Sequence, residues 1–260
     1  MKGLKLNKGY YIFSTLGSIL ILFLLIPVAI CLALGGAALG DVVQDKEALD
    51  AIYLSFHAGF VSGILIAIFG TPLAYVLSRH KNSFSQIVVS SLEIPLALPH
   101  SVAGIMVLLA YNSRAPIGSL LSRIGLTIED NYWGIVFAMM FVSAPIFVTT
   151  VRAGFDSVDV ELENVARTLG ASLLKVFFKV SFPLAFRHFV AGFVLSLARA
   201  ISEVGAIIIV AYYPKVAATL VIERFLGYGL DAALSLSAAL ALISLAVFAS
   251  LRLILKEAEQ

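Results

Sequence analysis

The sequence predicts an all-α integral membrane protein with six transmembrane helices and a cytoplasmic pair of helices between the fourth and fifth spans. Sixty per cent of the residues are apolar and only 13% are charged, whereas a soluble domain carries about 25% charged residues. The apolar residues also gather into runs of the roughly 20 residues that a helix needs to cross a bilayer. We therefore expect one transmembrane domain over residues 1–260.

Six apolar runs are candidate spans. The first is about twice as long as a signal-peptide core of roughly 7–15 residues, so we interpret it as an uncleaved span. Several prolines fall in or near the runs, where they kink helices, and we expect most of them to serve packing. The runs cover residues 10–39, 52–78, 87–111, 132–151, 188–211 and 232–251.

The distribution of lysine and arginine gives the spans a direction, because short cytoplasmic loops are enriched in both. With the N-terminus inside, the inside segments hold Lys2, Lys5, Lys8, Arg79, Lys81, Arg152, Arg167, Lys175, Lys179, Arg187, Arg252 and Lys256. The outside loops then hold only Lys46, Arg114, Arg123, Lys215 and Arg224. This asymmetry predicts that both termini are cytoplasmic.

Several function classes find no support in the sequence. A net charge of +2 without a basic block gives no reason to expect a nucleic-acid partner. His57 and His100 have no cysteine, histidine or carboxylate at metal-ligand spacing, so we predict no metal site and no cofactor. The phosphate-binding pattern GxxxxGK[ST] is absent. We therefore do not expect an enzyme, and any ATP hydrolysis must come from a partner subunit.

The segment 152–187 is the longest loop predicted inside, and its first half has the pattern of an amphipathic helix. Asp156 can cap the helix start, with Asp159 at the third position. Acidic residues then fall early, where the helix dipole favours them. Apolar residues at helical spacing form one side of this helix, namely Val160, Val165, Ala166 and Leu169.

The second half of the loop predicts a turn and another short helix. Gly170 suits the left-handed position that ends a helix. Ser172 can cap a second helix that runs until Pro183. Two short helices joined in this way could form a compact projection that binds a cytoplasmic partner. An amphipathic hairpin resting on the lipid interface explains the same pattern.

The spacing within this loop resembles the signature of ABC-importer permease subunits. That signature is Glu-Ala-Ala, three residues, Gly, nine residues, and Ile-any-Leu-Pro. Here Asn164-Val165-Ala166 stands for the triplet, Gly170 for the glycine and Val180-Ser181-Phe182-Pro183 for the last group. Asn164 replaces the usual glutamate, and Glu163 precedes it, so either residue can make the polar contact. The resemblance implies that Glu163, Asn164, Val165, Ala166, Gly170 and Pro183 couple the chain to an ATPase.

The resemblance covers about two-thirds of the chain and extends to permeases of the molybdate/tungstate and, less closely, the sulfate importers. It implies a homodimer in the cell membrane, two cytoplasmic ATP-binding subunits and an extracytoplasmic oxyanion-binding protein. Transport would proceed by alternating access, and the binding protein would supply the selective step. The matching segments are FGTPLAYVLSR, IPLALPHSVAGI, FVSAPIFVTTVRAGF, VARTLGAS, SFPLAFRHFVAG, SLARAISEVGA and AYYPKVAATLVIERF.

The fifth span carries charged residues within an apolar run. Gly192, Ser196, Arg199, Glu203 and Ala206 recur at intervals that place them on one helix face. Charges at this depth usually face a bundle interior or a watery cavity. Ser196, Arg199 and Glu203 could therefore line a translocation path, in which case the charge of Glu203 must be neutralised or turned aside. A buried structural pair between Arg199 and Glu203 explains the pattern as well.

Polar residues also interrupt the third span. Pro99, His100 and Ser101 break its apolar run, and a broken helix can aim backbone donors at an anion. We therefore include them in the predicted path, although His100 and His57 can equally be hydrogen-bonded within the bundle. A secondary anion transporter or channel that uses Arg199 and Glu203 directly is an alternative to the ABC permease. Inverted repeats would favour it, and the sequence contains no convincing one.

Overall fold

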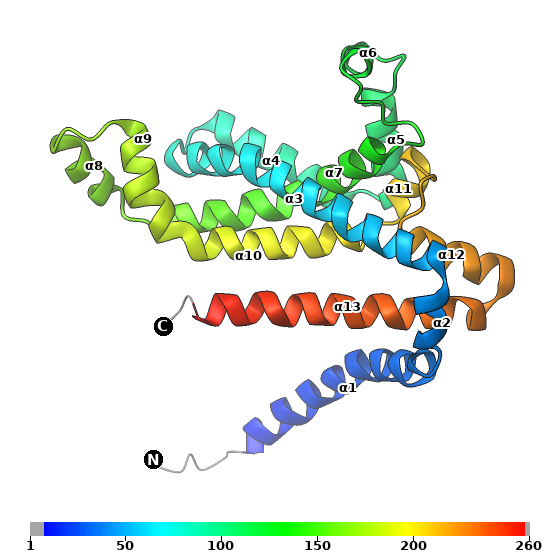
Figure 1. Ribbon diagram of the computed structural model, residues 1–260. Helices are drawn as coiled ribbons and strands as arrows, with labels where there is room; N and C mark the ends of the chain where they lie inside the picture. Colours follow the sequence, from blue (N-terminus) through cyan, green and yellow to red (C-terminus); the bar gives the residue numbers. More distant parts are fainter. Residues whose placement is uncertain (1–7, 258–260) are drawn as a thin grey trace. The chain divides into compact units, whose positions relative to one another are not determined.

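A computed structural model describes residues 8–257, which are helical throughout and contain no strand (Figure 1). The basic residues Lys2 and Lys5, which contribute to the predicted orientation, lie outside this part of the chain. The helices are α1 (Lys8–Gly36), α2 (Leu39–Gln44), α3 (Lys46–Arg79), α4 (Ser83–Ala97), α5 (His100–Tyr111), α6 (Pro116–Arg123), α7 (Tyr132–Asp156), α8 (Val160–Thr168), α9 (Leu173–Val176), the π-helical turn η1 (Phe177–Ser181), α10 (Phe182–Ile201), α11 (Gly205–Val210), α12 (Ala217–Tyr228) and α13 (Leu230–Glu257).

Five of the described helices are long and apolar enough to cross a membrane on their own. The pair α4–α5 passes the same criterion only as a unit and is bent by 119°, so the number reaches six if this pair is one span. The predicted class, an all-α membrane protein with a helix pair between the fourth and fifth spans, is confirmed.

The third span is interrupted where its prolines lie. Helix α4 accommodates Pro95 but ends at Ala97, and α5 begins at His100. Between them Leu98 is extended, with φ −89° and ψ 146°, because the ring of Pro99 disfavours the helical conformation of the residue before it. Pro99 then becomes the residue that precedes the first turn of α5.

The fifth span differs from the prediction at both ends. We expected it to begin at His188, but the helix runs without a break from Leu173 to Ile201. Pro183 does not end the preceding helix, because the wider π-helical turn η1 comes just before it and leads into α10. The helix then stops at Ile201, and α11 begins only at Gly205.

Contacts divide the chain into two units. The larger unit contains Asp50–Leu220, together with the described residues from Ala246 onward. The smaller contains the described residues up to Leu49, together with Val221–Leu245. The expectation of a single transmembrane domain stays a prediction.

Close helix packing forms the core of the larger unit, where α7 and α10 lie side by side (Figure 1). Helix α3 packs closely on α10, because a Cβ at Gly59 would lie 2.8 Å from Ile201 and one at Gly63 would lie 3.1 Å from Phe193. Small residues four apart are the usual means by which membrane helices approach each other.

The smaller unit has a close helix contact and an ion pair of its own. A Cβ at Gly35 of α1 would lie 2.6 Å from the carbonyl oxygen of Leu234 in α13. The Arg224 guanidinium lies 2.5 Å from the Asp45 carboxylate and 3.6 Å from that of Glu47. Arg224, which the charge distribution places in an outside loop, is therefore paired within the chain.

Candidate functional site

Helix α8 begins where Asp159, rather than Asp156, caps it. The Asp159 carboxylate accepts a hydrogen bond of 2.9 Å from the amide of Glu161. Asp156 is instead the last residue of α7, and its carboxylate lies 3.6 Å from Arg152 and 3.8 Å from Lys81. The expected cap is wrong by three residues, because α7 continues beyond the apolar run that predicted its end.

The turn between α8 and α9 has the predicted form. Gly170 has φ +86°, and its amide donates to the carbonyl of Arg167 at 2.9 Å. The amide of Ala171 donates to Ala166 at 3.0 Å, which closes the helix end. Ser172 then accepts from the amide of Lys175, and the prediction of a helix, a glycine turn and a second helix is confirmed.

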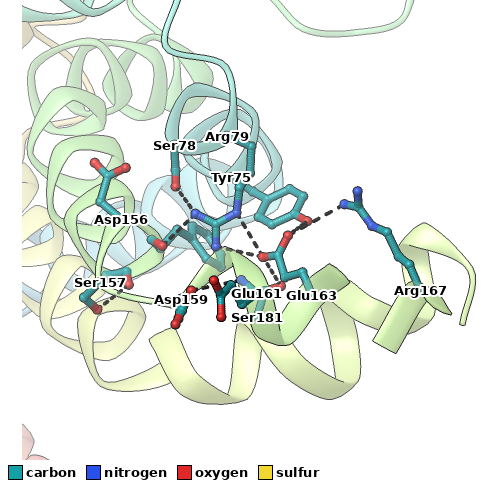
Figure 2. A network of polar contacts seen from close by, with 12 residues as sticks. Tyr75, Ser78, Arg79, Asp156, Ser157, Asp159, Glu161, Glu163, Arg167 and Ser181 are labelled. Carbon is teal, nitrogen blue, oxygen red and sulfur yellow. Dashed lines mark hydrogen bonds and ion pairs between the residues drawn. The ribbon is translucent and has the colours of Figure 1, made fainter. Parts of the chain in front are cut away.

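Glu163 holds α8 against the rest of the larger unit, as Figure 2 shows. The side chain of Glu163 is fully buried. Its Oε1 accepts from Nε and Nη2 of Arg79, at 2.9 and 2.7 Å, and from the Ser181 hydroxyl at 2.7 Å. Its Oε2 accepts from the Tyr75 hydroxyl at 3.1 Å. One carboxylate thus joins α8 to the end of α3 and to the turn η1.

The electrostatics of this network favour an ionised carboxylate. Burial disfavours the charged form of Glu163, but the hydrogen bonds that it accepts, led by those from Arg79 and Ser181, outweigh burial. The pKa of the Glu163 carboxyl therefore lies below its ordinary value. Arg167, four residues later, adds a more distant cation at 3.7 Å. Glu163 is consequently ionised at neutral pH and forms a charge pair with Arg79.

The structure separates the two polar residues between which the sequence could not choose. Glu163 is buried and bonded within the chain, whereas Asn164 is exposed. Val160, Val165 and Leu169, from the predicted apolar side, are also exposed, and Leu169 is 83% accessible. This chain therefore leaves most of that side uncovered, and it presents Asn164 outward.

A second cluster joins the two interrupted spans. His100, at the start of α5, places its Nδ1 2.8 Å from Oε2 of Glu203. Nη2 of Arg199 lies 2.8 Å from the same Oε2 and 2.8 Å from the same ring nitrogen. The other oxygen of Glu203 accepts from the amide of Ala206 at 2.8 Å. Nδ1 of His100 can accept from Arg199 or donate to Glu203, but it cannot do both.

The predicted stripe of the fifth span is therefore only partly correct. Arg199 and Glu203 pair as expected, but Ala206 belongs to α11 and not to the same helix. Ser196 is buried and donates to the carbonyl of Phe193 at 3.0 Å. Pro99 and Ser101 are exposed beside His100. The role of these residues in a translocation path stays a prediction.

Comparison with known proteins identifies the family. The model of the family described as "Binding-protein-dependent transport system inner membrane component" matches residues 70–258, which include both clusters. This chain belongs to that family. Its members are ABC-importer permeases, and the matched residues include the loop that carries α8, Gly170 and α9.

Curated relatives of this family share much of the sequence. The molybdate/tungstate transport system permease protein WtpB of Pyrococcus abyssi is 40% identical over 96% of this chain and 96% of its own length. The protein of the same name from Pyrococcus furiosus is 43% identical, with 93% of each chain covered. A sulfate transport system permease protein, CysT of Synechocystis, is 29% identical over 87% of this chain and 82% of its own.

Solved structures share the fold of this family at low sequence identity. A bacterial alginate ABC transporter, in complex with an alginate pentasaccharide-bound periplasmic protein, gives a TM-score of 0.70 at 18% identity. That match covers 95% of this chain and 94% of the other. The inward-facing MetNI methionine ABC transporter gives 0.66 at 14% identity, with 80% and 94% covered.

Sequence reasoning missed the residues that bind Glu163 within the chain. Tyr75 and Arg79 lie at the end of α3, and Ser181 lies in η1. Arg79 entered only as a cytoplasmic charge, and Ser181 only as a variable position of the signature. The available signal was Glu163 itself, directly before Asn164. Glu163 points to another side of α8 than Asn164, and a buried carboxylate needs a cation as its partner.

Proposed function

We propose that this chain is the permease subunit of an ATP-driven importer that moves molybdate and tungstate across the cell membrane. The observation that carries the proposal is the 40% identity to a molybdate/tungstate permease over 96% of both chains. The sulfate permease relative is more distant, at 29% identity. A sulfate importer is the second candidate, because a tetrahedral dianion of similar shape could use the same path.

The proposed assembly contains two copies of this chain, two cytoplasmic ATP-hydrolysing subunits and an extracytoplasmic oxyanion-binding protein. Both termini lie in the cytoplasm, as the distribution of basic residues favours. The proposal assigns ATP hydrolysis to the partner subunits and the selection of the oxyanion to the binding protein. Binding within the membrane path is weak, because a transported ion must also be released.

The uncovered side of α8 supports a docking role for this helix. Val165 and Leu169 are exposed apolar residues, and Asn164 lies beside them. In the proposal these residues enter a groove of the ATP-binding subunit. Ala166 and Gly170 form the turn that ends α8, since the Ala166 carbonyl accepts from Ala171 and Gly170 has a positive φ. Pro183 follows the π-helical turn η1, which connects this segment to α10.

The Glu163 network supports the next step, which is the transfer of motion. When two ATP-binding subunits close around nucleotide, the two α8 helices move with them. Because Glu163 binds Arg79 and Ser181, α8 cannot shift alone and carries the ends of α3 and α10 with it. The result is a rigid-body change between inward-facing and outward-facing states, driven by nucleotide that prefers one of them.

Reconstitution tests the proposal. The chain is purified with its ATP-binding subunits, placed in liposomes, and supplied with binding protein and labelled molybdate, tungstate or sulfate. We expect uptake of molybdate and tungstate that requires ATP and all three components, and little uptake of sulfate. Preferred sulfate uptake would favour the second candidate. Uptake by the permease alone, without ATP, would instead support a secondary transporter.

A further inference from the structure

The Arg199–His100–Glu203 cluster lies where two helix interruptions meet. One is the break between α4 and α5 before His100, and the other lies between α10 and α11. The backbones are in close contact here: a Cβ at Gly205 would lie 2.6 Å from Cβ of His100, and one at Gly104 would lie 2.7 Å from the carbonyl oxygen of Ala206. The cluster is therefore held on a fixed backbone.

The charged groups of the cluster differ in their exposure. Glu203 is 1% exposed, and its carboxylate points into the unit, where the amide of Ala206 and the Arg199 guanidinium bind it. The Arg199 side chain is 22% exposed and the His100 side chain 56%. The negative charge is thus turned aside, while cationic and donor groups remain accessible.

Arg199 retains hydrogen-bonding capacity on its accessible side. Within the described part of the chain, its side-chain contacts all use Nη2. Nε and Nη1 carry three further N–H donors, on opposite sides of the guanidinium, and each can make a single contact with an anion oxygen. Ser101 is exposed next to His100 in the sequence. Ser202, next to Glu203, is also exposed, but its hydroxyl donates to the carbonyl of Arg199 at 3.0 Å.

We propose that Arg199, with the His100 ring and the Ser101 hydroxyl, forms a shallow contact site for a tetrahedral oxyanion. The inference rests on the proposed function, because it places this site on the route of the transported ion. The buried Glu203 offsets part of the charge of Arg199, so the site attracts a dianion but holds it only briefly. A site with that balance allows passage, whereas an uncompensated cation would retain the ion.

Thiol labelling of the assembled complex tests this site without requiring transport. The chain has a single cysteine, so a Cys31→Ser background allows one thiol to be introduced at a time. Ser101→Cys and Ser202→Cys report on the site. Ser91→Cys is the matched control, because Ser91 is also an exposed serine of an interrupted span, and its hydroxyl donates to the Ile87 carbonyl of its own helix. Modification is measured by the mass of the permease chain.

We expect the thiols of the Ser101→Cys and Ser202→Cys variants to react faster with a sulfonate-bearing thiosulfonate than with a trimethylammonium one. A unit charge at about 7 Å in water would favour the anionic over the cationic reagent by roughly sevenfold. Glu203 offsets part of that charge, so we expect a preference of about twofold to sevenfold relative to the ratio at the control. Inorganic tungstate should slow both reactions and leave the control unchanged. Arg199→Gln should remove the anion preference and the protection, and Arg199→Lys, which keeps the charge but loses the planar donors, should weaken the protection.

Unchanged labelling rates in tungstate, or equal rates for the two reagents, would overturn the site. Inaccessible thiols at both positions would overturn it as well, since a surface closed by a second copy cannot contact an ion. None of these results would affect the proposed function if the unmodified complex still takes up molybdate. Conversely, a complex that transports only sulfate would refute that function, while tungstate protection would still establish the oxyanion contact.

Discussion

Two regions of the larger unit each contain an arginine–glutamate pair, but they use the arginine in different ways. In the Glu163 network the guanidinium of Arg79 is only 11% exposed and binds Glu163, the Ser78 hydroxyl and the carbonyl of Phe155. In the cluster of the interrupted spans, Arg199 uses one nitrogen and remains accessible. Both carboxylates are buried. The difference lies in the arginine, which is fully used where helices are joined and partly free where we infer an ion contact.

The largest expected loss of stability comes from replacing the arginine of each region. Arg79→Ala removes the cation that binds the buried Glu163 carboxylate directly and leaves only the more distant Arg167 at 3.7 Å. Loss of one partner of a buried pair costs about 3–5 kcal/mol. Arg199→Ala should cost less, because Arg199 binds Glu203 through one nitrogen and its side chain is partly exposed. Thermal unfolding of the purified protein in detergent measures both.

Lys81→Ala provides the control for Arg79→Ala. Lys81 is 71% exposed and lies 3.8 Å from Asp156, so its removal should change stability by less than about 1 kcal/mol. Equal losses for Arg79→Ala and Arg199→Ala would contradict the distinction between the two regions.

The next effect concerns the turn after α8. Gly170→Val places a β-branched residue at φ +86°, which costs about 1–3 kcal/mol. The strain shifts α8 and should reduce both assembly with the ATP-binding subunits and ATP-coupled uptake. Co-purification and uptake in liposomes measure the two losses.

Gly125→Val is a matched control for this turn. Gly125 has φ +83°, and an added Cβ would meet no atom within 4 Å at either glycine, so the backbone strain is the same. Gly125 lies after α6, in a loop predicted to be outside. If Gly125→Val reduced co-purification with the ATP-binding subunits as strongly, the docking role of α8 would be in doubt.

A smaller effect is expected from pH. Because the pKa of Glu163 is lowered in the folded protein, its network contributes stability above the pKa of the unfolded chain. That contribution is lost as pH falls through the folded value. Unfolding temperatures measured from neutral to acidic pH should therefore decline less steeply in Glu163→Gln than in the wild type. Parallel curves would show that the carboxylate is not held in its charged form.

The smallest effect on stability is expected on the uncovered side of α8. Leu169→Ser changes a residue that is almost fully accessible, so the unfolding temperature should stay nearly constant. Co-purification with the ATP-binding subunits should nevertheless fall. Leu120→Ser on α6, another exposed leucine, is the control and should leave that assembly intact. A normal yield of complex with Leu169→Ser would argue against docking through this side.

Local patterns in the sequence predicted much of the fold. Apolar runs indicated the spans, and Gly170 and Ser172 indicated the turn and the start of α9, because each depends on nearby residues. The end of α7 and the continuity through Pro183 were not predictable in this way. The first depends on packing beyond the apolar run, and the second on a π-helical turn that has no simple sequence signal.

The two clusters were accessible to sequence reasoning to different degrees. Arg199 and Glu203 are four residues apart on one chain segment, so their pairing could be predicted. The partners of Glu163 could not, because Arg79 precedes it by 84 residues and only tertiary structure brings them together. His100 was identified as a polar interruption of its span, but its approach to Glu203 required the crossing of two broken helices.

The continuous helix from Leu173 to Ile201 connects the segment after α8 to the cluster around Arg199. At 1.5 Å per residue, its 29 residues extend about 43 Å, with the turn that follows α8 at one end and Arg199 near the other. A tilt of about 10° around one end would swing the opposite end by roughly 7 Å. The π-helical turn η1 interrupts the regular hydrogen-bonding of this helix. If α8 docks as proposed, the stiffness of η1 would determine how much of a movement at α8 reaches the interrupted spans.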